Sequence, residues 1–176
     1  MRNTHPENTE GLTPAIIQSL LNVGVKQAGI ARIFGVSRQA VHDMIRRYDL
    51  HRMTRQELLE EDWPWALTVD EGLQAPARRL REHGEWVLTD GQGVGGKGFR
   101  ESVLKRLRAF YRKLQDENLV IEYDPHIPPE PGSTQYGGFA YRARRESDGD
   151  MLIRENEYTH ITEKGRTLWT FPSHYP

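Results

Sequence analysis

Hydrophobic residues in the first third of the chain recur every three or four positions, which is the spacing of one face of a helix. Thr13 followed by Pro14 predicts a helix start, and Gly24 predicts its end. Two more short helices are expected after it. Together the three share a small core, formed by Ile16, Ile17, Leu20, Leu21, Val25, Ile30, Phe34, Val41, Ile45 and Tyr48. Because a core of this size gives little stability, we expect it to depend on contacts with later parts of the chain.

The stretch from Gln27 to Arg46 has the pattern of a helix-turn-helix. Ala31 is a small residue where two helices can cross closely, Gly35 lies four positions later at the turn, and Ser37 is placed to cap a second helix. The motif thus matches in its small residue, its glycine, its helix cap and the spacing of its apolar positions. An ordinary helical hairpin with a solvated polar face is the alternative.

The second helix of this motif carries polar side chains suited to DNA. Arginine can pair bidentately with guanine and glutamine with adenine, and a helix N-terminus favours phosphate. The pattern therefore predicts base contacts along the polar face and phosphate contacts beside it. The expected base-reading residues are Arg38, Gln39, His42 and Arg46, and the expected phosphate-binding residues of this helix are Ser37 and Arg47.

Residues 54–72 are predicted to connect two domains. Thr54 and Glu57 have the T-x-x-E spacing of a capping box that opens a short helix. Residues 57–71 contain six acids and no Lys or Arg, which argues against DNA contact. Trp63 and Trp65 are expected to pack at the junction between the domains.

The second half predicts a small α+β domain. Helices are expected from Leu73 to His83, ended by Gly84, and from Phe99 to Gln115. Strands are expected at 119–123, 138–142 and 151–154, followed by a hairpin into 158–161 and a last helix capped by Thr162. The fold class is thus mainly α, with a three-helix helix-turn-helix domain and a C-terminal domain of helices packed on a short antiparallel sheet. The expected divisions are a flexible arm at 1–11, the helix-turn-helix domain at 12–53, the connection at 54–72 and the second domain at 73–176.

A glycine-rich segment, GQGVGGKG at 91–98, lies between the two predicted helices of the second half. It nearly matches a phosphate-binding loop, but Gly98 stands where that motif has Ser or Thr. Too few strand-helix units are present to build the parallel sheet behind such a loop, so we do not expect nucleotide hydrolysis. A loop that brings Lys97 to a DNA phosphate and a plain linker are the two remaining interpretations.

Charge is unevenly distributed along the chain, although the formal net charge is only −1. Residues 13–55 carry seven Lys or Arg against two acids, residues 77–113 carry ten against four, and residues 114–158 carry four against ten. Two cationic stretches beside an acidic one fit a protein that touches a polyanion on one side. The second stretch is expected to hold DNA phosphates through Arg78, Arg79, Lys97, Arg100, Lys105, Arg108 and Arg112. For the last three, a solvated helix face is an equally good interpretation.

Composition narrows the function classes. The chain has no cysteine, which excludes disulfides and thiolate metal sites. No apolar run approaches membrane-spanning length, and the N-terminus lacks the apolar core of a signal peptide, so we expect a soluble cytosolic protein. We also expect no cofactor, metal or small-molecule ligand.

No catalytic motif is evident, because neither H-E-x-x-H nor Gly-x-Ser-x-Gly occurs. We therefore expect a DNA-binding protein that is not an enzyme. A small recombinase or nuclease that docks through the helix-turn-helix is the alternative, since carboxylates distant in sequence can converge in space. In a third interpretation, the acidic residues 114–158 bind a partner protein.

From Thr13 to Trp169 the chain resembles the immunity repressors of temperate mycobacteriophages that use many dispersed, asymmetric operator and stoperator sites. The resemblance rests on GVSRQAV at 35–41, WPW at 63–65, LREHGE at 80–85, NLVIEYDP at 118–125, GGFAY at 137–141 and LIRENE at 152–157 with LW at 168–169. It implies a lysogeny repressor in the host cytosol that binds double-stranded DNA on the nucleoid as a monomer. The glycine-rich segment at 91–98 departs from the family pattern.

Overall fold

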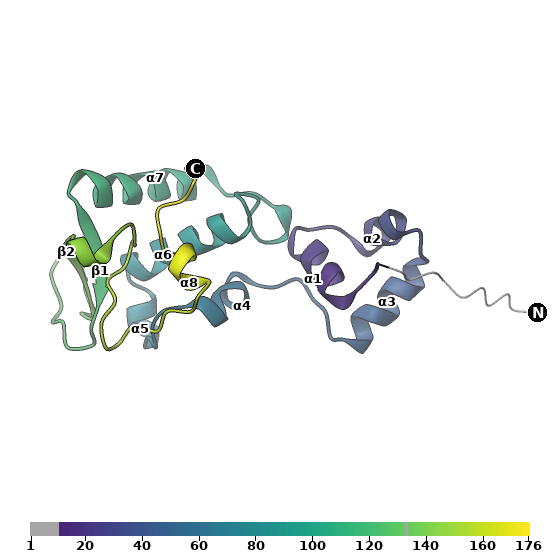
Figure 1. Ribbon diagram of the computed structural model, residues 1–176, viewed down its shortest axis with the longest axis horizontal. Helices are drawn as coiled ribbons and strands as arrows, with labels where there is room; N and C mark the ends of the chain where they lie inside the picture. The colour runs from purple at the N-terminus through teal and green to yellow at the C-terminus, as the bar shows by residue number, and fades with distance from the viewer. Residues whose placement is uncertain (1–10, 133) are drawn as a thin grey trace, which may run out of the picture. The chain divides into compact units, whose positions relative to one another are not determined.

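The computed structural model describes residues 11–132 and 134–176, which divide into two compact units. The first contains residues up to Thr54 together with Gln92–Gly98, and the second contains Arg55–Gly91 and Phe99–Pro176. The described chain is mainly helical with one two-stranded antiparallel sheet, as the sequence predicts (Figure 1). Residues 1–10 of the predicted arm lie outside the described residues.

The first unit is built on three short helices, α1 (Pro14–Asn22), α2 (Gln27–Phe34) and α3 (Arg38–Arg47). Thr13 caps α1 as predicted, because its side-chain oxygen accepts the N–H of Ile16. The chain turns between α2 and α3 at Gly35, which has a left-handed φ of +64°. The helices share one small core of buried residues, Leu12, Ile17, Ile30, Ala31 and Val41.

The glycine-rich segment packs with the first unit, in contrast to its predicted place in the second domain. Its short helical turn η2 (Val94–Gly96) lies against the C-terminal end of α1. A Cβ at Gly24 would fall far inside van der Waals distance of the Gly95 carbonyl oxygen, and one at Gly96 would do the same to the carbonyl oxygen of Val23. The two backbones therefore touch directly, which only glycine allows. A plain linker would not pack in this way, so that interpretation is wrong.

The second unit contains α4 (Arg55–Leu59), α5 (Val69–Gly72), α6 (Ala75–Leu88), α7 (Glu101–Asp116) and α8 (Gly165–Leu168). Of these, α6 contacts α4, α5, α7 and α8 and so occupies the centre of the unit. Its core includes Leu80, Leu107, Leu114, Phe139, Leu152 and Trp169.

Helix α6 continues past Gly84, where the sequence predicted its end. A Cβ at this position would lie 2.5 Å from Leu59 Cδ2 and 3.2 Å from the Trp169 ring. Glycine is therefore present because α4 and the Trp169 ring approach the helix closely, and it does not terminate α6. Trp63 and Trp65 pack edge-on in the core of the same unit, where Trp63 also meets Trp169 at a centroid distance of 5.6 Å.

The sheet pairs β1 (Leu119–Tyr123) with β2 (Phe139–Ala143), in a register that sets Leu119 opposite Ala143. The third predicted strand, 151–154, makes only two isolated bridges, a parallel one from Ile153 to Ile121 and an antiparallel one from Met151 to Thr170. It does not extend further because the N–H of Leu152 donates to the Trp169 carbonyl oxygen at 2.7 Å.

The predicted hairpin strand at 158–161 is also absent from the described structure. Here the Asn156 side chain accepts the N–H of Tyr158 at 3.0 Å and folds the chain into a tight turn. Thr162 accepts the N–H of Gly165 at 2.8 Å, so it does stabilise the start of the last helix as predicted.

Candidate nucleic-acid interface

Helix α3 begins at a well-formed cap in the first unit. The hydroxyl oxygen of Ser37 accepts the N–H of Ala40 at 3.0 Å, and Ser37 itself is exposed. The N-terminal end of α3, with the positive end of its dipole, is therefore open to solvent on the side of Ser37.

The polar side of α3 is also open. Arg38, Gln39, Asp43, Arg46 and Arg47 are exposed, and His42 is half-buried, whereas Val41 is completely buried. We call the set Arg38, Gln39, His42, Asp43 and Arg46 the α3 face. Among the described residues, its two arginines and Arg47 form no ion pair. Their charge is available to a ligand.

One contact of the α3 face was not foreseen from the sequence. The side-chain amide of Gln39 donates from Nε2 to Oδ1 of Asp43 at 2.8 Å. The two residues are four positions apart, the spacing at which glutamine and aspartate pair on a helix surface. That spacing was the signal in the sequence that could have identified Asp43.

In the second unit, α7 presents cations along its solvent side. Lys105 and Arg112 are exposed and have no ion-pair partner among the described residues, and Arg100 is exposed at the N-cap. Arg108 differs, because it forms an ion pair with Glu101. Leu107, Phe110, Tyr111 and Leu114 on the other side of the helix are buried, so the cationic side cannot turn inward.

The three arginines at the start of α6 have different surroundings. Arg78 is exposed, whereas Arg79 is half-buried and paired with Glu82, which also lies 3.4 Å from Arg106. Burial lowers the pKa of Arg79 and its carboxylate partner raises it, with burial the larger effect. The charge of Arg79 is already balanced within the protein, so Arg79 is a weaker candidate for phosphate binding than Arg78.

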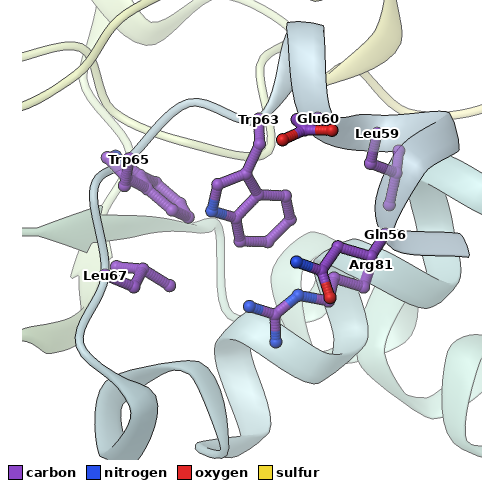
Figure 2. Close-up of a pocket in the computed structure, with 7 residues that line it drawn as sticks. All are labelled: Gln56, Leu59, Glu60, Trp63, Trp65, Leu67 and Arg81. Carbon is purple, nitrogen blue, oxygen red and sulfur yellow. The ribbon is translucent and has the colours of Figure 1, made fainter.

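Arg81 faces a pocket of the second unit and not open solvent (Figure 2). Its guanidinium lies 4.7 Å from the centre of the Trp63 ring and donates to the carbonyl oxygen of Gly72. The pocket measures about 270 Å³ and is lined by Gln56, Leu59, Glu60, Trp63, Trp65, Leu67 and Arg81. Arg81 thus supports the Trp63 ring, which packs against the core.

Comparison of the whole chain with known proteins identifies its family. The chain is 37% identical, over 162 residues, to the repressor-like immunity protein of Mycobacterium phage L5, and the match covers 92% of this chain and 85% of that relative. The chain belongs to the mycobacteriophage immunity repressor family. This confirms the family resemblance that the motifs indicated.

A second match is of a different kind. A valine–tRNA ligase of Mesorhizobium japonicum is 24% identical over 146 residues, but the chain spans only 15% of that enzyme. A similarity this low, over so small a part of the ligase, carries no functional argument. No protein-family model matches the chain.

For this member of the repressor family, the described residues offer few other sites. No group of three or more His, Asp or Glu within 11–132 and 134–176 could hold a metal ion. Within the same ranges no helix combines the length and apolarity that crossing a bilayer requires. Lys97 is exposed on the glycine-rich segment and so belongs to the first unit, although in sequence it falls in the second cationic stretch.

Proposed function

We propose that the chain is a transcriptional repressor that maintains phage lysogeny and superinfection immunity by binding double-stranded DNA. Its sites would be short asymmetric operators and stoperators, bound by a monomer. Membership of the immunity repressor family supports the regulatory role. The observation that supports DNA binding is the α3 face, which is exposed and carries two arginines without ion-pair partners among the described residues. It follows the N-terminus of α3, which is open to solvent.

In this proposal α3 is the recognition helix of a helix-turn-helix and enters the major groove. Arg38 and Arg46 have the donors for guanine, Gln39 has the donor and acceptor for adenine, and His42 lies between them. Ser37 and Arg47 contact the phosphates beside the groove. The major groove is wide enough for one helix, and this is how helix-turn-helix proteins read bases.

A single recognition helix makes few contacts, so the second unit adds phosphate contacts. Among the described residues, the predicted phosphate-binding cations of the second unit that are exposed and form no ion pair are Arg78, Arg100, Lys105 and Arg112, and Lys97 adds one from the first unit. Phosphate contacts fix register and orientation without reading sequence. Contacts on one side of the reading helix would define the direction of an asymmetric site and remove the need for a two-fold partner.

Replacing Gln39 or Arg38 with alanine should weaken binding to the specific site by about 1–3 kcal/mol and relax the preference at one base pair. The reason is the loss of a bidentate base contact. Competition binding with duplexes that differ at single positions measures both effects. Exposed Arg32 on α2 provides the control, because Arg32→Ala removes the same charge outside the α3 face. An equal loss on random-sequence DNA would show that Arg38 and Gln39 contact phosphates only.

The double variant Lys105→Ala/Arg112→Ala should reduce the slope of log affinity against log salt by about one per lost phosphate contact. Arg108→Ala is the matched control on the same helix, since Arg108 is paired with Glu101 and should change the slope less. Titration of a labelled duplex between low and moderate salt gives the slope. An unchanged slope in the double variant would remove α7 from the interface.

A further inference from the structure

The Gln39–Asp43 pair suggests how one base is selected. Both side chains are exposed on α3, one helical turn apart, and Nε2 of Gln39 lies 2.8 Å from Oδ1 of Asp43. Among the described residues Asp43 forms no ion pair, and its bond to Gln39 is the one hydrogen bond that its side chain makes there. We propose that Asp43 is a positioning residue that fixes the Gln39 amide for adenine and against guanine, an inference that rests on the proposed function.

The carboxylate of Asp43 permits only one orientation of the Gln39 amide. A carboxylate only accepts hydrogen bonds, so it takes an N–H of the amide, whereas the reversed amide would set two acceptor oxygens against each other. One N–H of Gln39 is thereby occupied. The carbonyl oxygen and the second N–H have no hydrogen-bond partner among the described residues.

This remaining pair of groups matches one base edge. Adenine offers the N7 acceptor and the N6 donor in the major groove, which the free N–H and the free carbonyl oxygen of Gln39 satisfy together. Guanine offers two acceptors, N7 and O6, and would need two N–H donors. Because Asp43 already uses one donor and holds the oxygen outward, guanine would meet an acceptor at the same place.

Asp43 also places a negative charge on a surface that faces phosphates. This charge weakens binding to every DNA sequence equally, so it has a cost that its positioning role must offset. Removal of the carboxylate should therefore change the overall affinity for DNA and the selection of adenine in opposite directions. Affinity for random-sequence DNA should rise about two- to threefold through the lost repulsion, while the selection of adenine over guanine should fall.

The experiment compares Asp43→Ala with Asp43→Asn in the full chain. The asparagine variant removes the charge and leaves an amide that can either accept from Gln39 or donate to it, so it no longer fixes one orientation, whereas the alanine variant removes the partner altogether. The wild-type chain first selects its site from a randomised duplex library. Each variant is then titrated with the selected duplex, with duplexes that carry guanine for adenine at single positions, and with random-sequence DNA. Thermal unfolding of both variants checks that α3 is intact.

We expect both variants to lose about fivefold of the adenine-over-guanine preference at the position that Gln39→Ala also affects, because neither leaves a group at position 43 that only accepts hydrogen bonds. Retention of the preference in either variant would overturn the proposal, as would a loss at other positions of the duplex. A Gln39→Ala variant without any adenine-specific effect would overturn it as well. Failure of the wild-type chain to select any duplex would instead refute the proposed function, so the two failures are distinguishable.

Discussion

Alanine at Gly24 should destabilise the first unit by on the order of 3 kcal/mol or more. Two costs add at this position. The backbone has a φ of +87°, which costs an L-residue about 1–2 kcal/mol, and the new Cβ would overlap the carbonyl oxygen of Gly95. The overlap involves backbone on both sides, so no side-chain rotation can relieve it. The glycine-rich segment should then separate from α1.

Gly98 offers a matched control in the same segment. Its φ of +68° imposes a similar backbone cost, but nothing lies within 4 Å of a Cβ built there. Gly98→Ala should therefore carry only the cost of the backbone conformation, without the cost of a steric overlap. Every tryptophan lies in the second unit, so tryptophan fluorescence should be the same in both variants. The stability of the first unit is instead measured by hydrogen exchange of the amides in α1–α3. Equal loss of protection in the two variants would contradict direct packing between Gly24 and Gly95.

The same packing matters for any dissection of the protein. A fragment that ends near residue 54 lacks Gln92–Gly98 and leaves the end of α1 uncovered. Weak DNA binding by such a fragment would therefore not measure the contribution of the second unit. Substitutions in the full chain are the sounder comparison.

Stability should fall by about 3 kcal/mol as the pH drops from about 6.5 to 4, because of His83. The His83 ring is fully buried between the Tyr111 hydroxyl, at 2.8 Å, and the Leu168 carbonyl oxygen, at 2.7 Å. Burial lowers the pKa of His83 to about 4, despite the opposing hydrogen bond to the carbonyl. The unfolded chain therefore binds this proton first, and acid favours unfolding.

Denaturant unfolding followed by tryptophan fluorescence at several pH values measures this loss. His83→Gln removes the titrating group and should flatten the curve between pH 4 and 6.5, whereas His160→Gln changes an exposed histidine of the same unit and serves as control. A pH slope that persists in His83→Gln would assign the effect to another group.

Two buried carboxylates of the second unit add little in this window, because the folded chain holds their pKa values below the ordinary value for aspartate, which already lies at the acid end of the window. Burial raises the pKa of Asp62, but its bonds to Lys164 and Thr162 together lower it by more. The hydrogen bond from Arg154 lowers the pKa of Asp148. Both groups therefore stay ionised in the folded chain over the range in which His83 acts.

Local signals in the sequence predicted the elements that depend on local chemistry. Two helix starts are examples, one at Thr13 before Pro14 and one at Ser37 after Gly35. In each, the hydroxyl of Thr13 or Ser37 accepts an N–H from a residue only three positions away. Contacts between distant residues were not predictable in the same way. Gly84 looked like a helix end because nothing in the sequence shows that Leu59 and Trp169 approach it. The glycine-rich segment was misplaced for the same reason, since its partner is the end of α1.

In the candidate interface, too, local features were predictable from the sequence and contacts between side chains were not. Apolar periodicity identified the exposed side of α3, and the structure leaves its arginines free of ion pairs among the described residues. On the second unit, sequence alone could not separate free cations from paired ones. Arg79 is neutralised by Glu82 on its own helix and Arg108 by Glu101, and Arg81 lies over Trp63. Only the three-dimensional arrangement distinguishes these from Arg78, Lys105 and Arg112.

The most direct test of the account is a hydroxyl-radical footprint of the full chain on a duplex that it has selected. We expect protection of the deoxyriboses that flank one major-groove segment, where α3 reads bases, and further backbone protection on one side of it only. The variant Lys105→Ala/Arg112→Ala should lose that lateral protection and keep the central one. A two-fold symmetric footprint, or protection that does not change in this variant, would contradict a monomer that reads DNA with one unit and holds its backbone with the other.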